Sequence, residues 1–299
     1  MSLPAPVSPL RKRHFSQIAT RFDREFGVYW AFMNSRPRAC FTAELLAELK
    51  QYLEEIEESH AQPDGEGVVR YGVLASKNRG IFNLGGDLSL FRDCIERQDR
   101  ESLIKYGMAC VANLYPWHRN CDLQMTSMAL VQGEALGGGF EAALSATVLI
   151  AEESARMGFP EILFNLFPGM GAFSFLSRKV GRRAADELIT SGNVYSARQL
   201  YEMGVVDVLT ADGTGEQAVY AFVKNHAKRS NGLRGYERAR NEVEPVSEDE
   251  LMRVVNVWAD TALKLSARDV RMMERLVRAQ GRPAEPIYPD NFAKVVPIA

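Results

Sequence analysis

The chain has 299 residues, of which 46% are apolar, so it is long enough to bury a large core as a globular protein. Its 36 Lys and Arg nearly balance its 38 Asp and Glu, and this balance, without a concentrated basic stretch, argues against nucleic acid as a partner. The four cysteines and four histidines are scattered, so we expect a cytoplasmic protein that needs no metal and no cofactor.

The start of the chain predicts a leader, a hairpin and a helix. Residues 1–14 lack the apolar run of a signal peptide and are expected to be a flexible leader. Between residues 17 and 33, β-prone side chains flank a turn near Gly27, which is typical of a hairpin. Thr42 is a candidate N-cap for the next helix, in which apolar residues recur at three- and four-residue steps.

A pattern of strand, glycine loop and helix then recurs along the chain. It begins with a strand at 68–75, which leads to the glycines before a helix from Leu88, and Asp87 is expected to cap that helix. A long helix at 100–117, a strand at 127–131, a glycine run and helix-forming residues at 142–146 come next. This alternation predicts an α/β domain whose loops at the strand ends hold ligands.

The last third of the chain is predicted to be helical. A strand at 205–209 and a polar, glycine-containing loop precede it, which divides the chain into a core at 15–210 and a helical region at 211–299. Two apolar helical faces there, one of them containing Trp258, would cover the active site, a partner subunit or both. The longest apolar region, 135–151, contains a glutamate and three consecutive glycines and is too short to span a bilayer.

Two glutamates and a glycine run form the strongest candidate site. Gly137, Gly138 and Gly139 precede Glu141, while Glu161 lies in the apolar segment 157–163. Glycine lets the backbone approach a ligand closely, and a helix start adds exposed N–H donors. A carboxylate among aromatic side chains should have a raised pKa, because burial disfavours its charged form. One glutamate could then donate a proton while the other accepts one.

Other interpretations of these residues involve no proton transfer by the two glutamates. Three glycines after a strand could merely permit close packing of a helix on a sheet. The same glycines, with Glu161 some 20 residues further along, match a loose dinucleotide-binding fingerprint. That fingerprint would indicate an oxidoreductase. Glu141 in the phosphate-binding turn would repel a pyrophosphate, which argues against that class. Met170 and Trp258 are candidates for an acyl pocket, although an aromatic residue on an apolar helical face is more often ordinary core.

The motifs together resemble the crotonase, or enoyl-CoA hydratase/isomerase, superfamily over roughly residues 15–265. The segments that carry the resemblance are Phe82-Asn83-Leu84-Gly85-Gly86-Asp87, Gly137-Gly138-Gly139-Phe140-Glu141, Gly158-Phe159-Pro160-Glu161 and Phe167-Pro168-Gly169. The resemblance implies a ββα spiral core, and it places the backbone N–H groups of an oxyanion hole at Leu84, with Gly85 as an alternative, and at Gly138. It also implies that Glu141 and Glu161 do acid–base work and that the Gly169 amide positions a water or hydroxyl.

Within this superfamily the segments are most similar to bacterial diffusible-signal-factor synthases. That similarity implies dehydration of a 3-hydroxyacyl group on acyl carrier protein, followed by hydrolysis of the thioester to a cis-2-unsaturated fatty acid used as a quorum-sensing signal. It further implies a homo-oligomer, as a trimer or a dimer of trimers, and regulation by the receiver domain of a sensor kinase. The alternatives are an enoyl-CoA hydratase/isomerase acting on CoA thioesters and a non-catalytic binding protein of the same fold.

Overall fold

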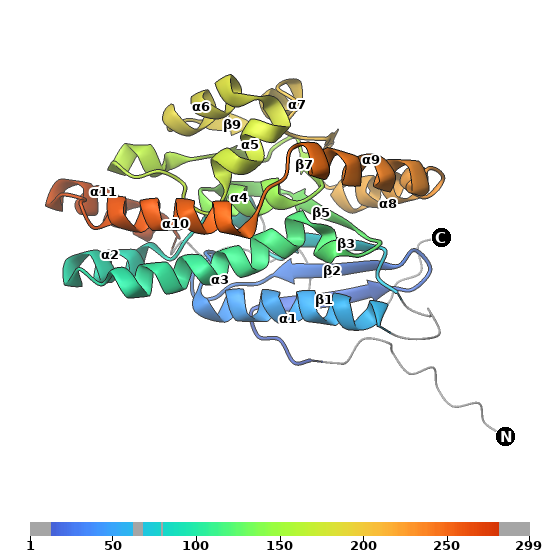
Figure 1. Ribbon diagram of the computed structural model, residues 1–299, viewed down its shortest axis with the longest axis horizontal. Helices are drawn as coiled ribbons and strands as arrows, with labels where there is room; N and C mark the ends of the chain where they lie inside the picture. Colours follow the sequence, from blue (N-terminus) through green and yellow to red (C-terminus); the bar gives the residue numbers. More distant parts are fainter. Residues whose placement is uncertain (1–12, 62–67, 79, 281–299) are drawn as a thin grey trace.

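The computed structural model of the protein describes residues 13–61, 68–78 and 80–280. Within them the chain forms two β-sheets with helices packed around them (Figure 1). The larger sheet has the strand order β1-β2-β3-β5-β7-β10 and the smaller the order β4-β6-β8-β9. The strands are β1 Ile18–Asp23, β2 Val28–Met33, β3 Tyr71–Ser76, β4 Gly80–Asn83, β5 Thr126–Val131, β6 Gly133–Leu136, β7 Val148–Glu152, β8 Arg156–Gly158, β9 Val194–Ser196 and β10 Val208–Thr210.

Eleven α-helices occur in the described residues, and the last four follow one another without an intervening strand. Two short 3-10 helices, η1 Asn120–Asp122 and η2 Pro160–Phe164, accompany them. The α-helices are α1 Ala43–His60, α2 Leu88–Arg97, α3 Arg100–His118, α4 Gly138–Ser145, α5 Ala172–Val180, α6 Arg182–Thr190, α7 Ala197–Glu202, α8 Gly215–Ala227, α9 Ser230–Val243, α10 Glu248–Ala262 and α11 Ala267–Gln280.

The predicted hairpin and first helix are confirmed. Strands β1 and β2 pair antiparallel, with Ile18 opposite Met33. The Thr42 hydroxyl caps α1 by accepting a hydrogen bond from the Leu45 amide at 3.2 Å. The buried face of α1 packs beside α3, and this pair of helices covers the edge of the molecule next to β1 and β2 (Figure 1).

The core is a succession of ββα units that builds both sheets at once. Strands β2, β3, β5, β7 and β10 run parallel in the larger sheet. Strands β4, β6 and β8 run parallel in the smaller one. The chain therefore adds one strand to each sheet and then returns through helices, which confirms the expected spiral.

The short strands of the smaller sheet were missing from the sequence-based assignment. Strands β6 and β8 have four and three residues, and each contains a glycine at one end, so they resemble loops in sequence. The expected strand at 205–209 is shifted to β10, and α4 begins at Gly138, earlier than the expected 142. Pairing with distant strands and stacking of a helix start decide these boundaries, and neither leaves a local signal.

Of the C-terminal helices, α10 and α11 share the main core, whereas the buried residues of α8 belong to a second cluster. Val255 of α10 packs against Gly107 of α3, and Trp258 of α10 is buried. The expected leader falls largely on residues 1–12, and the tail beyond 280 follows α11, so both lie outside the described residues. Among the described helices, none is long and apolar enough to cross a membrane.

Candidate active site

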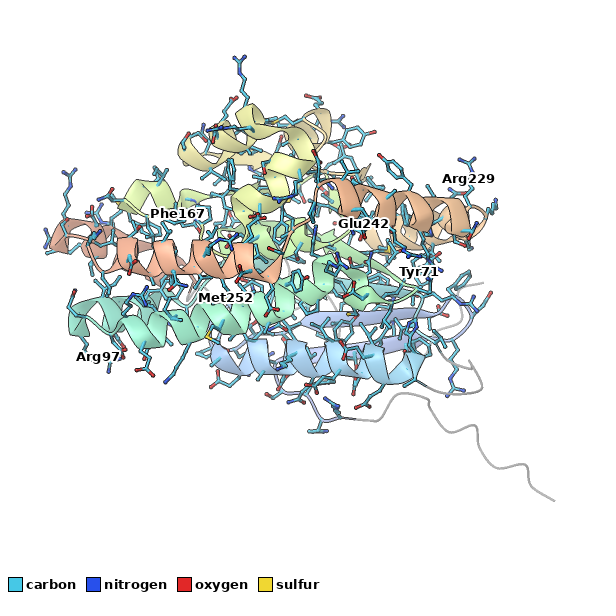
Figure 2. All side chains as sticks on the ribbon, viewed as in Figure 1. Tyr71, Arg97, Phe167, Arg229, Glu242 and Met252 are labelled. Carbon is cyan, nitrogen blue, oxygen red and sulfur yellow. The ribbon has the colours of Figure 1, made fainter. Side chains whose placement is uncertain are left out.

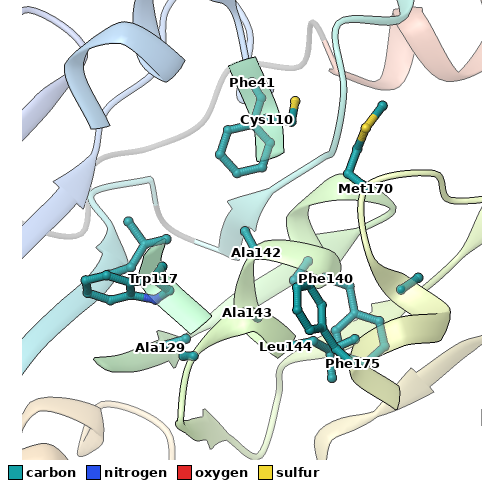
Figure 3. Packing of buried hydrophobic residues seen from close by; sticks show 14 of the residues in the cluster. Phe41, Cys110, Trp117, Ala129, Phe140, Ala142, Ala143, Leu144, Met170 and Phe175 are labelled. Carbon is teal, nitrogen blue, oxygen red and sulfur yellow. The ribbon is translucent and has the colours of Figure 1, made fainter. Parts of the chain in front are cut away.

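A cavity of about 160 Å³ lies between α1, α3, α4 and α10 and is lined mainly by apolar side chains. Figure 3 shows five of the lining residues around the space above α4. These five are Phe41, Cys110, Trp117, Ala142 and Met170. Both candidate glutamates line the same cavity, so the structure joins the site predicted from sequence to a deep apolar pocket.

Glu141 lies in the first turn of α4 and its side chain is only 2% exposed. Its Oε1 atom accepts hydrogen bonds from the amides of Met170, at 2.7 Å, and Ala172, at 3.0 Å. Burial raises the pKa of the Glu141 carboxyl to about 7, and the two N–H donors partly oppose this rise because they stabilise the charged form. Two hydrogen bonds thus hold the Glu141 carboxyl in place at the cavity wall, and its pKa is close to neutral pH.

Glu161 lies in η2, opposite the glycine run. A Cβ atom added to Gly137 would come within 2.2 Å of Glu161 Oε1, so this carboxylate rests directly on the backbone before α4. Its Oε2 atom is buried and has no hydrogen-bond partner among the described residues. Burial, and then the negative charge of Glu141, raise the pKa of Glu161 to about 8. The raised pKa expected from sequence is found for both carboxyls, and the pair can hold one proton at neutral pH.

The glycine run brings α4 against the loop that follows β4. Gly137 has φ +53° and Gly85 has φ +93°, a region that side chains rarely adopt. A Cβ atom on Gly139 would lie 2.0 Å from the Asn83 carbonyl oxygen. Gly138 is the first residue of α4, where the helix provides no acceptor for its N–H group. The Gly138 amide can therefore donate to a ligand in the cavity, while its part in an oxyanion hole stays a prediction.

The assignment of the second oxyanion-hole donor to Leu84 or Gly85 is wrong in this structure. The Leu84 amide donates to the Ala39 carbonyl at 2.7 Å, and the Gly85 amide donates to Asn83 Oδ1 at 2.8 Å. Each N–H has one hydrogen, so both are already committed to holding the loop. The next amide along the loop, at Gly86, has its nitrogen 3.4 Å from the position that a Cβ atom on Gly138 would take.

A network of hydrogen bonds fastens the Gly86 loop to neighbouring segments. The Tyr106 hydroxyl donates to the Phe41 carbonyl at 2.8 Å and accepts from the Asp87 amide at 3.2 Å. The Asp87 carboxylate accepts from the amides of Ser89 and Leu90, which confirms its predicted role as the cap of α2. The loop is therefore held from both ends.

Both residues expected around the acyl group lie at the cavity, while their contact with an acyl chain stays a prediction. Met170 and Trp258 both line the cavity, and Trp258 makes an edge contact with Phe91 at a ring-centroid distance of 5.0 Å. A Cβ atom on Gly169 would lie 2.3 Å from Trp258 Cγ, so only glycine fits under this indole. The amides that contact Glu141 are those of Met170 and Ala172, while water positioning by the Gly169 amide stays a prediction. Phe167, also at the cavity, is labelled in Figure 2.

The inner wall of the cavity was missing from the sequence-based site. It comes from α1 and α3, whose lining side chains include Leu49, Tyr52, Leu53, Asn113 and Trp117. In the sequence these residues signal only an amphipathic helix face, which is equally typical of ordinary core. In the part of the chain that the structure describes, no group of three or more His, Cys, Asp or Glu side chains could hold a metal ion.

Known proteins match this chain along most of its length. The family model for enoyl-CoA hydratase/isomerase matches residues 25–276. The fatty acid oxidation complex subunit alpha of Pseudomonas syringae pv. tomato is 32% identical over 140 residues, and that of Pseudomonas putida is 31% identical over 142 residues. These matches cover 47% of this chain and 19% of each relative, so the chain corresponds to about a fifth of those proteins.

Solved structures share the fold at lower identity. Enoyl-CoA hydratase from Bacillus halodurans has a TM-score of 0.70 at 18% identity, covering 88% of this chain and 100% of that one. Human mitochondrial delta3-delta2-enoyl-CoA isomerase has a TM-score of 0.67 at 17% identity, covering 89% and 100%. Pseudomonas aeruginosa DspI has a TM-score of 0.63 at 21% identity, covering 90% and 98%. With the fold, the glutamate pair and the matched family model in agreement, the chain belongs to the enoyl-CoA hydratase/isomerase, or crotonase, family.

Proposed function

We propose that this protein is a diffusible-signal-factor synthase. It dehydrates a 3-hydroxyacyl group carried on acyl carrier protein and hydrolyses the resulting thioester, releasing a cis-2-unsaturated fatty acid that serves as a quorum-sensing signal. The observation that carries the proposal is the pair Glu141 and Glu161, with raised pKa values, at the wall of a cavity lined mainly by apolar side chains. The motif resemblance narrows this chemistry to the signal synthases.

The dehydration follows from the placement of the two carboxyls. Ionised Glu161 takes the proton from Cα, protonated Glu141 donates its proton to the departing 3-hydroxyl group, and water leaves as the Cα–Cβ double bond forms. The amides of Gly138 and Gly86 would stabilise the negative charge on the thioester oxygen. In other enzymes, removing a single such donor raises the activation free energy by about 3 to 4 kcal/mol. The pair holds one proton near neutral pH, and the pKa values of about 7 for Glu141 and about 8 for Glu161 place it mainly on Glu161. The reacting form, with the proton on Glu141, is therefore the less populated arrangement of the pair.

The hydrolysis uses the same donors. A water molecule adds to the thioester carbonyl carbon, the oxyanion forms between the same two amides, and the C–S bond breaks to release the acid and the carrier thiol. The dehydration leaves Glu161 protonated and Glu141 ionised, so Glu141 is the carboxylate that can accept a proton from that water, and Glu161 can give its proton to the leaving sulfur. The step thus balances and returns both carboxyls to the protonation states with which the dehydration began.

Product analysis tests the proposal directly. Purified protein is incubated with a series of 3-hydroxyacyl carrier thioesters, and the products are identified by mass spectrometry with synthetic cis and trans standards. A free cis-2-enoic acid is the expected product. Recovery of the unchanged thioester from every substrate would reject catalysis and favour the non-catalytic binding protein instead.

An enoyl-CoA hydratase/isomerase acting on CoA thioesters is the second candidate. The matched family model and the names of the structural relatives favour it. Such an enzyme would hydrate or isomerise short enoyl-CoA substrates and would release no fatty acid. Rapid turnover of a CoA thioester without loss of the thioester bond therefore selects this candidate.

The remaining expectations belong to the same proposal. A signal synthase of this kind would work in the cytoplasm as a homo-oligomer and would be bound by the receiver domain of a sensor kinase. Analytical ultracentrifugation of the purified protein tests the oligomer, since a trimer or dimer of trimers sediments far from a monomer of 33.4 kDa.

A further inference from the structure

Helix α11 carries a row of exposed arginines. Arg268, Arg271 and Arg275 are spaced three and four residues apart, so they share one face of the helix. The opposite face holds Val270 and the fully buried Met273, which pack against the main core. The orientation of α11 is thus set by its apolar side, and its basic face points to solvent.

Among the side chains that the structure describes, this basic face has no ion-pair partner. None of the three arginines forms an ion pair with them, whereas exposed Arg100 and Arg253 on other helices pair with Asp260 and Asp249. Asp269, next to Arg268 in the sequence, uses its carboxylate to accept from Ser266 and Asn165. A row of three exposed arginines in a chain with a net charge of -2 is a local excess of positive charge that attracts an acidic partner.

The basic face also lies next to the catalytic segment. Helix α11 contacts η2, which contains Glu161, and it packs along α2, as Figure 1 shows at the edge of the molecule. The hydrogen bond from Asn165 Nδ2 to Asp269 Oδ2, at 3.4 Å, joins the end of η2 to the start of α11. A partner bound on this face would be well placed to deliver a group to the cavity.

We propose that the α11 basic face, Arg268, Arg271 and Arg275, docks an acidic carrier protein that presents the acyl thioester on a flexible arm. The row spans seven residues, or about 10 Å at 1.5 Å per residue, which is longer than a single phosphate group and suits the acidic side of a protein helix. This inference rests on the proposed function, because it assumes a carrier-bound thioester.

Charge reversal tests the docking. The full-length double variant Arg268→Glu/Arg271→Glu is compared with Arg182→Glu/Arg183→Glu, which makes the same charge change on exposed residues of α6. Two readouts are measured: binding of an acidic acyl carrier protein by surface plasmon resonance, and kcat and KM for one acyl group supplied either on the carrier or on pantetheine alone. Circular dichroism and thermal melting confirm that each variant is folded.

The α11 variant should lose carrier affinity and raise the carrier-thioester KM by on the order of tenfold at low salt, because reversed charges repel an acidic partner. The difference should shrink as salt screens the charges. Turnover of the pantetheine thioester, and both readouts for the α6 variant, should stay at wild-type values.

Two results would overturn the docking. These are unchanged carrier binding in the α11 variant and an equal loss with the pantetheine thioester. Failure of the proposed function looks different. In that case the carrier binds the wild type and is released by charge reversal, but no fatty acid forms from any thioester.

Discussion

At the scale of single residues, the most specific prediction concerns the two carboxyls. Glu141→Gln and Glu161→Gln should each lower kcat by roughly 10²- to 10⁴-fold while the protein stays folded, since glutamine keeps the shape but transfers no proton. Because one carboxyl must be ionised and the other protonated, kcat/KM of the wild type should peak between the pKa values of about 7 and about 8 and fall on either side. Steady-state kinetics across pH measures both effects. Full turnover by either variant would disprove its role.

The same carboxyls link stability to pH. Their folded-state pKa values lie above the value of about 4.3 for an unfolded glutamate, so the folded state binds more protons above that pH. The free energy of unfolding should therefore decrease as pH rises from about 4.3 to about 8. Urea unfolding at several pH values measures this slope. The double variant Glu141→Gln/Glu161→Gln should show a flatter dependence, and an identical slope would contradict the burial of these charges.

Tyr106 acts on the site through the loop that it holds. Its hydroxyl joins the Phe41 carbonyl to the Asp87 amide, next to Gly86. Tyr106→Phe removes both hydrogen bonds and should destabilise the fold by about 1 to 3 kcal/mol, since the partners are left unpaired. If the loop positions an oxyanion donor, kcat should also fall by on the order of tenfold with KM little changed. A stability loss without a change in kcat would assign Tyr106 a structural role only.

At the scale of elements, the contact between α3 and α10 depends on one small residue. A Cβ atom on Gly107 would lie 2.3 Å from Val255 Cγ1. Gly107→Ala should therefore destabilise the protein by about 1 to 3 kcal/mol through overpacking, despite the better helix propensity of alanine. In a Val255→Ala background the same change should become stabilising, by up to about 1 kcal/mol.

Chemical denaturation of the four variants in this cycle measures the coupling. Gly235→Ala in α9 is the matched control, because nothing lies within 4 Å of its added Cβ atom, and it should be neutral or stabilising. If Gly107→Ala costs the same with and without Val255, the two helices do not meet at this point.

At the scale of the whole molecule, the cavity between α1, α3 and α4 should set the length of the acyl chain. Leu49 lines its inner wall, and Leu49→Phe adds volume there. The longest thioester that is processed should become shorter, while turnover of short chains should persist. Leu49→Met conserves volume and serves as the control, with a stability cost under about 1.5 kcal/mol. Product profiles by mass spectrometry decide the outcome, and an unchanged profile would place the chain elsewhere.

Local signals were enough to determine several features from the sequence alone. Thr42 and Asp87 were identified as helix caps because capping depends on a side chain and amides two or three residues away. The hairpin followed from alternating β-prone residues around a turn. Glu141, Glu161 and Gly138 were identified because their motifs are contiguous segments whose residue types the chemistry demands. These features need no knowledge of distant contacts.

Only the tertiary structure decided the rest. Strands β6 and β8 exist because they pair with strands far away in the chain. The amides of Leu84 and Gly85 are excluded as donors by acceptors at Ala39 and Asn83, which spacing within a motif does not reveal. The sequence by itself thus identified the two carboxyls and the glycine run that the structure brings to one cavity. Packing of separate segments decided that the Leu84 and Gly85 amides are already paired and how large the cavity is, because both depend on contacts between residues distant in sequence.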